Sequence, residues 1–195
     1  MNMIFSADEN WGIGKGNRLL YRIPPDMRRF KEKTTNGVVV MGRKTLESLP
    51  GGAPLANRTN IVLTRHPDGL CARVIEQVMS DDTLRICTSQ EALFMTLREI
   101  GSEPERTWVI GGAEILALLA PYCQGAYVTR IEAADREADC HAIRLDTESG
   151  WELAETGELQ EWEGLRYRFD RYRNQNVKSV AIYQAAAPRS RSVSD

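Results

Sequence analysis

The sequence predicts a single α/β domain with a central, mostly parallel twisted sheet, an antiparallel C-terminal strand and helices on both faces. Apolar runs alternate with helical segments as far as residue 133, which is the order of a parallel sheet joined by crossover helices. The run at 37–42, GVVVMG, is apolar throughout between its glycines, as in a strand buried on both faces. The segment at 164–173 alternates large and polar residues, which is typical of a half-exposed antiparallel strand.

The expected elements follow one another with short connections. Pro24 and Pro25 suit the start of a helix at 25–34, because proline needs no partner for an N–H there. Ser89 is the expected cap of a helix at 89–101, and Gly101 its stop. The remaining expected elements are strands at 1–7, 37–42, 58–65, 83–88, 106–112 and 125–133, and helices at 43–49 and 113–122.

The C-terminal part differs from the rest. The antiparallel strand at 164–173 needs a hairpin partner, which we expect within 151–164. The segment 174–195 is rich in Ser, Ala and polar residues, and it predicts a loosely ordered tail or a short added strand at 177–184. We therefore expect a domain at 1–173 and a tail at 174–195.

Length and composition exclude several classes of protein. A chain of 195 residues supports one good hydrophobic core, and its net charge of −2 argues against a general nucleic-acid binder. No apolar run approaches the length of a membrane span, and the N-terminus lacks the basic and apolar regions of a secretory signal. The four cysteines form no CxxC pair and only two histidines are present, so we expect reduced thiols and no metal site.

Asp26 is the single carboxylate in the apolar stretch NRLLYRIPPDMRRF at 17–30. An acid at a helix start is ordinary, because negative charge there suits the helix dipole. The functional alternative is that Asp26 shares an apolar helix face with Phe30. A carboxylate on that face would be partly desolvated, and its raised pKa would let it handle a proton near neutral pH. These residues alone leave both interpretations open.

Three strand ends carry groups that suit phosphate. The turn at 42–45 combines a glycine with basic residues and a helix start, the turn at 64–66 combines Thr, Arg and His, and the turn at 111–112 is a glycine pair before a helix. Each of these turns alone is an ordinary connection between a strand and a helix. Because the carboxyl ends of parallel strands meet at one edge of a sheet, the three together favour a dinucleotide with an extra phosphate.

Five blocks resemble, in order and spacing, those of the dihydrofolate reductase family over about residues 1–173. The blocks are GIGKGNRLLYRIPPDMRRFKEKT, VVVMGRKTLESL, NRTNIVLTR, WVIGGAEIL and AYVTRIEA. The resemblance implies NADPH-dependent reduction of 7,8-dihydrofolate to 5,6,7,8-tetrahydrofolate, with hydride transfer to C6 and protonation at N5. It also implies antifolate inhibitors as ligands and a monomeric, cytoplasmic enzyme.

The resemblance implies catalytic roles for Asp26, Tyr21 and Thr129, with Asp26 as the acid of the pterin pocket. Arg58 would bind the glutamate α-carboxylate of the substrate, a task suited to a bidentate guanidinium. The implied substrate-binding residues are Ile4, Phe5, Ser6, Asp26, Met27, Phe30, Leu49, Leu55, Arg58 and Ile110.

The resemblance also implies how NADPH binds. Thr64 and Arg65 would hold the adenosine 2′-phosphate, the Gly111–Gly112 turn with its cis peptide bond would carry the pyrophosphate, and residues 10–20 would form a mobile loop over the nicotinamide. The implied cofactor-binding residues are Ser6, Ile13, Gly14, Asn17, Leu19, Gly42, Arg43, Lys44, Thr45, Leu63, Thr64, Arg65, Ile110, Gly111, Gly112, Ala113, Glu114 and Ile115.

Four positions depart from the usual pattern of the family. Tyr21 stands where tryptophan is usual, Ser6 where alanine is common, Leu116 where an aromatic residue often lies, and Glu114 where some members have a basic residue. We hypothesise that Tyr21, Ser6 and Leu116 weaken the binding of diaminopyrimidine inhibitors. The alternatives for the whole chain are a related pterin or pyrimidine reductase on the same fold, and a non-catalytic NADPH-binding domain.

Overall fold

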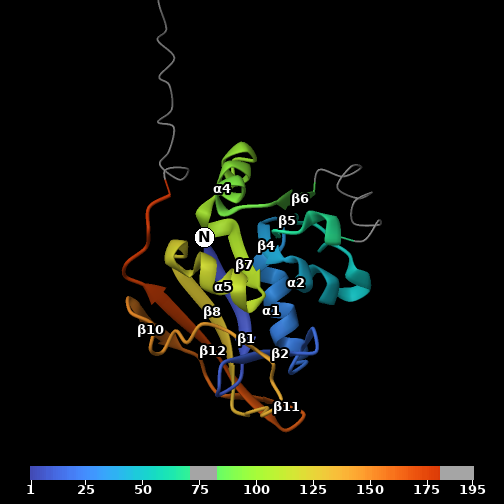
Figure 1. Ribbon diagram of the computed structural model, residues 1–195. Coiled ribbons are helices and arrows are strands. Elements are labelled where there is room, and N and C mark those ends of the chain that lie inside the picture. Colours follow the sequence, from blue (N-terminus) through green and yellow to red (C-terminus); the bar gives the residue numbers. More distant parts are fainter. Residues whose placement is uncertain (71–82, 181–195) are drawn as a thin grey trace, which may run out of the picture.

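The computed structural model describes residues 1–70 and 83–180. Figure 1 shows a twisted sheet with strand order β10-β12-β8-β1-β7-β4-β5-β6, and β11 pairs with β12. Its strands are β1 (Asn2–Ala7), β4 (Val38–Gly42), β5 (Thr59–Leu63), β6 (Leu84–Cys87), β7 (Thr107–Gly111), β8 (Gly125–Ile131), β10 (Trp151–Thr156), β11 (Gln160–Trp162) and β12 (Leu165–Asn174). β1 and β4 to β8 pair in parallel, whereas β12 runs antiparallel to its neighbours. The predicted fold class is confirmed.

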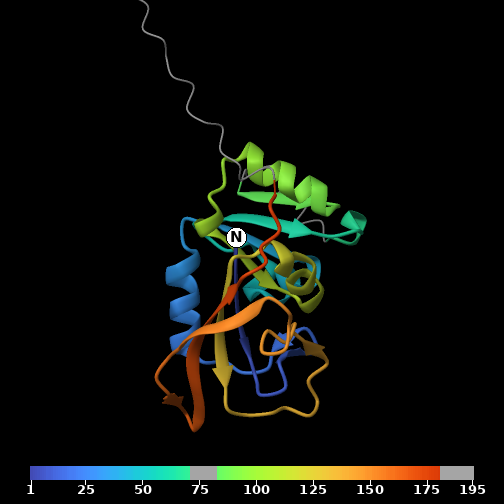
Figure 2. The ribbon, with the colours of Figure 1, turned by 90° about the vertical axis from the view of Figure 1, so that its left-hand side faces the viewer.

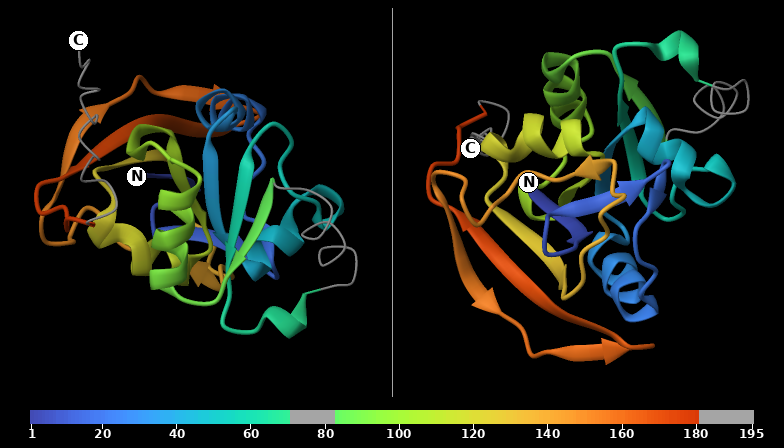
Figure 3. Two further views of the ribbon diagram at one scale, coloured as in Figure 1. Left: turned by 90° about the horizontal axis from the view of Figure 1, so that it is seen from above. Right: turned by 60° about the horizontal axis from the view of Figure 1, so that its bottom comes forward.

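Helices cover both faces of the sheet. The helices of the described residues are α1 (Pro24–Thr34), α2 (Arg43–Ser48), α4 (Gln90–Glu99) and α5 (Ala113–Leu119). α1 and α2 pack on one face, and α4 and α5 pack on the other (Figures 2 and 3). The predicted helix at 113–122 stops being α-helical at Leu119 and continues as a 3₁₀ turn, because Pro121 has no N–H for the helical ladder.

The apolar side chains of β4 lie in two hydrophobic clusters, one on each face of the sheet. Val38 and Val40 join the buried cluster that contains the leucines of α4 and α5. Val39 and Met41 join the cluster on the opposite face, where α1 and α2 pack. Because side chains alternate along a strand, only a strand covered on both sides can bury every one of these residues. The expectation of a doubly buried strand is confirmed.

A small second sheet was not expected from the sequence. β2 (Gly12–Lys15) lies between β3 (Arg18–Leu19) and β9 (Cys140–His141) in the order β3-β2-β9. These strands are short, and β2 contains two glycines, so none shows the apolar alternation that marks a strand. The segment expected as a loop at 10–20 is therefore a hairpin joined to a distant part of the chain.

The C-terminal hairpin and residues 175–180 agree with expectation only in part. The expected partner region of β12 holds two strands, β10 and β11, which pair with different parts of β12. Residues 175–180 form neither helix nor strand, and the amide of Lys178 donates to the carbonyl of Pro121 at 2.8 Å. The possible strand at 177–184 is thus absent over 177–180, and its remainder lies outside the described residues.

The described cysteines Cys87, Cys123 and Cys140 are free thiols, whereas Cys71 lies outside the described residues. Within residues 1–70 and 83–180, no group of three His, Cys, Asp or Glu side chains is arranged to hold a metal ion. No helix in the same residues is long and apolar enough to cross a membrane.

Candidate active site

Asp26 lies in the first turn of α1, where Pro24 and Pro25 begin the helix. Its side chain is directed at β8, because the Thr129 hydroxyl donates a hydrogen bond to Asp26 Oδ1 at 2.5 Å. Thr129 is fully buried. This contact answers the question left open by the sequence, since the carboxylate is partly enclosed between helix and sheet and is not a solvated helix-start acid.

Three influences act on the pKa of Asp26, and burial is the largest. Burial raises the pKa because the ionised form loses hydration, whereas the hydrogen bond from Thr129 and the Arg29 guanidinium one turn along lower it. The net result is a pKa above the ordinary value of 3.8. A carboxyl group in this state can accept and return a proton at higher pH than an exposed aspartate.

Arg29 is a member of the site that sequence reasoning missed. Its guanidinium lies 4.2 Å from the centre of the Phe169 ring on β12, and burial lowers the pKa of Arg29. The spacing of three residues from Asp26 on one helix was the available signal. The aromatic partner that holds Arg29 beside the carboxylate becomes visible only once β12 is placed.

An apolar surface adjoins Asp26 on the same face of the sheet. Ile4 is buried there, and four half-buried side chains pack against the same cluster, so each keeps a surface open to a ligand. These four are Phe30, Leu49, Leu55 and Ile110. Ser6 of β1 is paired in register with Thr129, which sets the Ser6 side chain beside the Asp26 contact. Most of the expected substrate-binding residues are thus brought together.

Arg58 is fixed at the far end of α1. Its Nη1 donates to Thr34 Oγ1 at 3.0 Å, and its Nε donates to the carbonyl of Ala56 at 3.0 Å. Burial lowers the pKa of Arg58, although the guanidinium stays charged at any physiological pH. Since Thr34 is eight residues beyond Asp26 on the helix, the acid and the arginine are separated by about 12 Å along the helix axis.

Two of the expected phosphate turns touch one another. β4 and β7 are neighbouring parallel strands; Gly42 ends β4 and caps α2, and Gly112, directly after β7, caps α5. A Cβ added to Gly42 would come within 3.1 Å of Ile115 Cγ1, and one added to Gly112 within 3.5 Å of Thr45 Oγ1. The Gly111–Gly112 peptide bond is cis, as the family resemblance implied. Bare backbone at two adjacent helix starts suits close approach by a phosphate group.

The third turn is more exposed and carries opposite charges. Thr64 Oγ1 accepts a hydrogen bond from the amide of His66 at 3.2 Å. The Arg65 side chain is 83% exposed and that of Glu114 is 91% exposed, and their charged atoms are 4.0 Å apart. Such a pair is weak in water, so Arg65 remains available to an anion. Arg43 is instead engaged with Glu47 at 2.5 Å, and Lys44 is exposed.

The hairpin of β2 and β3 is held by the chain around β9. The amide of Gly16 donates to Asp139 Oδ2 at 2.8 Å, and the amide of Asp139 donates to the carbonyl of Gly14 at 3.2 Å. Lys15 forms an ion pair with Glu137. The bonds are exposed and few, so this hairpin can open at little cost compared with the main sheet.

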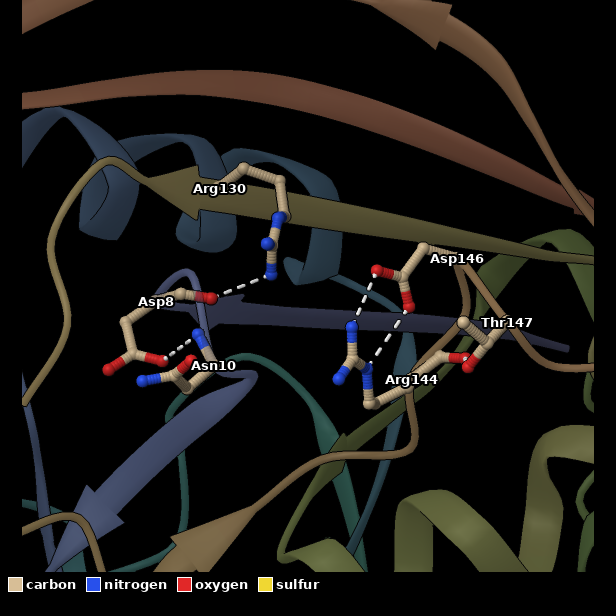
Figure 4. Close-up of polar contacts among 6 residues, drawn as sticks. All are labelled: Asp8, Asn10, Arg130, Arg144, Asp146 and Thr147. Carbon is tan, nitrogen blue, oxygen red and sulfur yellow. Dashed lines mark hydrogen bonds and ion pairs between the residues drawn. The ribbon is translucent and has the colours of Figure 1, made fainter. Parts of the chain in front are cut away.

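The root of that hairpin is fixed more firmly. Asp8 Oδ1 accepts from the amides of Asn10 at 2.9 Å and Gly12 at 2.7 Å, and Arg130 of β8 donates to the Asp8 carbonyl at 2.7 Å. Figure 4 shows Arg130 reaching Asp8 and, nearby, a separate pair of Arg144 with Asp146. The base of the hairpin is therefore anchored beside β8.

Several expected site residues lie elsewhere. Tyr21 packs against the Ile23, Ile131 and Tyr167 cluster, and within the described residues no hydrogen bond joins it to Asp26. Phe5 packs with the cluster on the opposite face from Ile4, because neighbouring side chains of a strand point in opposite directions. Met27 and Leu19 are exposed, whereas Leu63 and Leu116 are buried. Ala113 begins α5, and three residues lie on the hairpin: Ile13, Gly14 and Asn17.

Replacing Asp26 by asparagine is expected to stabilise the fold at neutral pH. The folded-state pKa of Asp26 is raised, so its contribution to stability is full below the unfolded pKa and is lost as pH rises through the folded pKa. The free energy of unfolding of Asp26→Asn should therefore exceed that of the wild type at pH 7, and the difference should shrink as pH falls. Urea unfolding across pH measures this.

The matched control is Asp146→Asn. Burial raises the pKa of Asp146, but hydrogen bonds, including that from Arg144, outweigh it and hold the pKa below the ordinary value. This variant should lose stability at pH 7. Loss of stability at pH 7 in both variants would contradict the description of Asp26.

Comparison with known proteins gives one family. The family described as "Dihydrofolate reductase" matches residues 1–174. The dihydrofolate reductase of Bacillus subtilis is 36% identical over 178 residues, which cover 90% of this chain and 95% of the relative. That of Mycobacterium tuberculosis is 35% identical, covering 88% and 96%, and that of Mycobacterium leprae is 33% identical with the same coverage. The chain belongs to the dihydrofolate reductase family.

Proposed function

We propose that the surface around Asp26 binds 7,8-dihydrofolate and reduces it to 5,6,7,8-tetrahydrofolate with NADPH, the cofactor of this family. The observation that carries the proposal is the pair of half-buried Asp26 and buried Thr129 at one end of an apolar surface, with Arg58 at the other. Arg58 is anchored on Thr34, about 12 Å from Asp26 along the helix axis. Dihydrofolate has the matching layout, with a polar pterin at one end, an aromatic ring in the middle and a glutamate carboxylate at the other.

Asp26 orients the pterin and manages its proton. The Thr129 hydroxyl donates to Oδ1 of Asp26, and within the described residues Oδ2 of Asp26 makes no hydrogen bond. Oδ2 is therefore left to accept hydrogen bonds from the 2-amino group and N3 of the pterin. The raised pKa keeps protonated carboxyl available at higher pH than an ordinary aspartate would. Asp26 thereby promotes protonation at N5. Thr129 is proposed to assist Asp26 directly through its hydrogen bond. Tyr21 is proposed to assist only after its side chain has moved out of the cluster in which it packs.

The residues present fit NADPH. The glycine turns at 42 and 111–112 offer bare backbone at adjacent helix starts, beside Thr45 and Ile115, and suit the pyrophosphate. Thr64, Arg65 and Lys44 are proposed for the 2′-phosphate. When bound, NADPH supplies the hydride that reaches C6. The hairpin at 12–19 is proposed to close over this region and exclude water, and Arg58 to align the substrate by its carboxylate.

The two alternatives are less well supported. A pterin or pyrimidine reductase would use the phosphate turns but would have no use for Arg58 anchored opposite Asp26. A non-catalytic NADPH-binding domain would gain nothing from a buried carboxylate, which costs stability at neutral pH.

That the chain acts as a monomer stays a prediction. A cytoplasmic location, a domain at 1–173 followed by a loosely ordered tail, and weakened diaminopyrimidine binding through Tyr21, Ser6 and Leu116 stay predictions. Leu116 of α5 is fully buried in the hydrophobic core, so any effect of this residue on inhibitor binding would have to be indirect.

The direct test is NADPH oxidation with dihydrofolate by wild type and Asp26→Asn. We expect turnover by the wild type and a loss of about 10²–10⁴-fold in kcat/KM at pH 7 for the variant, the usual range for losing a proton-handling group. The Kd for NADPH serves as the control and should be unchanged. A wild type that binds NADPH and leaves dihydrofolate unreduced would overturn the proposal.

Arg29 should set the pH at which reductase activity declines. Replacing Arg29 by methionine removes a cation that lowers the pKa of Asp26, so the pKa should rise further. The pH at which kcat/KM declines should then move to higher pH than in the wild type. Arg28→Met, an exposed neighbour on the same helix, is the control and should leave the profile in place. A shift to lower pH in Arg29→Met would refute the role.

Arg65 and Glu114 should act oppositely on the choice of cofactor. Arg65→Gln is expected to raise KM for NADPH about tenfold by removing a charge-assisted bond to the 2′-phosphate. Glu114→Gln is expected to lower it about two- to threefold by removing a nearby negative charge. Neither change should alter KM for NADH by as much. Equal effects on both cofactors would place the 2′-phosphate elsewhere.

A further inference from the structure

The face of the sheet that holds Asp26 carries a second polar region, at the amino ends of the parallel strands. The register of β8 and β12 pairs Tyr127 with Arg171 and Gly125 with Arg173. Paired residues of neighbouring strands project to the same side of a sheet. Both arginines therefore lie on the face where α1 packs, and the last turn of α1 brings Lys33 to the same place.

Three cations surround the ring of Tyr127. The Lys33 ammonium is 4.5 Å from the ring centre, the Arg171 guanidinium 5.7 Å and the Arg29 guanidinium 5.8 Å. An aromatic ring attracts each of them, but three like charges around one ring also repel one another.

This cluster holds more positive than negative charge. Arg171 is paired with Glu155 at 2.9 Å. Within the described residues, Lys33 has no carboxylate within 4.0 Å and neither does Arg29. Burial, followed by repulsion from Arg29 and Arg171, lowers the pKa of Lys33, and attraction to Glu155 and Glu32 only partly offsets this. Repulsion of this kind is relieved when an anion enters.

A hollow of about 670 Å³ opens beside these cations. Its lining includes Lys33, Arg171, Arg173, Trp108, Tyr127 and Glu105. Gly125 lies in its wall, and a Cβ there would come within 3.2 Å of the Tyr172 carbonyl and 3.3 Å of Asn2 Oδ1, so the wall is closely packed at this point. The volume falls in the range of small-molecule sites, and three of the named lining groups are cationic against one acid.

The hollow lies away from the phosphate turns and from Thr129, and it adjoins the end of α1 where Thr34 anchors Arg58. Trp108 and Gly125 stand at the amino ends of β7 and β8, whereas the phosphate turns and Thr129 lie toward the carboxyl ends. Thr129 is four residues along β8 from Gly125, which corresponds to about 13 Å of strand. NADPH held at the carboxyl edge would leave the hollow open.

We propose that this hollow binds a small multivalent oxyanion, of the oligophosphate class, between Lys33, Arg171 and Arg173. Each cation donates to a different oxygen, and the Tyr127 ring lies beside Lys33 and Arg171. Binding of the anion in this hollow does not require that the protein reduce dihydrofolate.

The test is calorimetric titration of inorganic pyrophosphate into full-length protein saturated with NADPH, so that the cofactor's phosphate turns are already filled. One binding event is expected. The double variant Lys33→Gln, Arg171→Gln should weaken it by about tenfold or more, and the effect should grow as salt is lowered. Arg28→Gln, which removes an exposed charge from the same helix, should leave binding unchanged.

Glu155→Gln gives a test that does not depend on losing a residue of the site. Glu155 competes with the anion for Arg171, so its removal should tighten pyrophosphate binding about two- to threefold. Absence of binding to the wild type would overturn the proposal. Equal weakening by Arg28→Gln, or no tightening by Glu155→Gln, would reduce it to general attraction by surface charge.

Discussion

The hydrogen bond from Thr129 to Asp26 is the contact on which the site depends. It joins α1 to β8 across 103 positions of the chain and holds the carboxylate where burial outweighs the two influences that lower its pKa. Without the burial between helix and sheet, an aspartate in the first turn of a helix would be solvated and keep an ordinary pKa. The stability lost by enclosing the charge is the physical cost of a proton-handling group in this position.

The register of the sheet then distributes the other groups along α1. The row of Ser6, Thr129 and Phe169 meets the first turn of the helix, where Asp26 lies. Rows nearer the amino ends of β1 and β8 meet the last turn, where Arg58 is anchored on Thr34. One helix against one sheet face thus sets the distance between the acid and the arginine, and Lys33 on the same helix borders the cationic hollow.

The parts of this arrangement that could be predicted are those with a local cause. The doubly buried strand followed from an unbroken apolar run, and the start of α1 from its prolines. The pairing of β2 with β9 could not be predicted, because it joins residues more than a hundred positions apart. β2 and β3 pair locally, but both are short and lack the apolar alternation of a strand. Arg29 could not be singled out from the sequence, because its aromatic partner Phe169 lies far along the chain on β12. The position of Phe5, opposite Ile4, was within reach of the sequence, since alternation along β1 requires it.

The most direct measurement is the titration of the Asp26 carboxyl carbon by NMR, assigned with Asp26→Asn. Burial against Thr129 predicts a pKa above the ordinary 3.8, and a further rise in Thr129→Val, which loses the hydrogen bond that lowers it. A pKa at or below the ordinary value would contradict this. Asp26 would then be a helix-start carboxylate stabilised by the dipole, and the proton at N5 would have to come from another source.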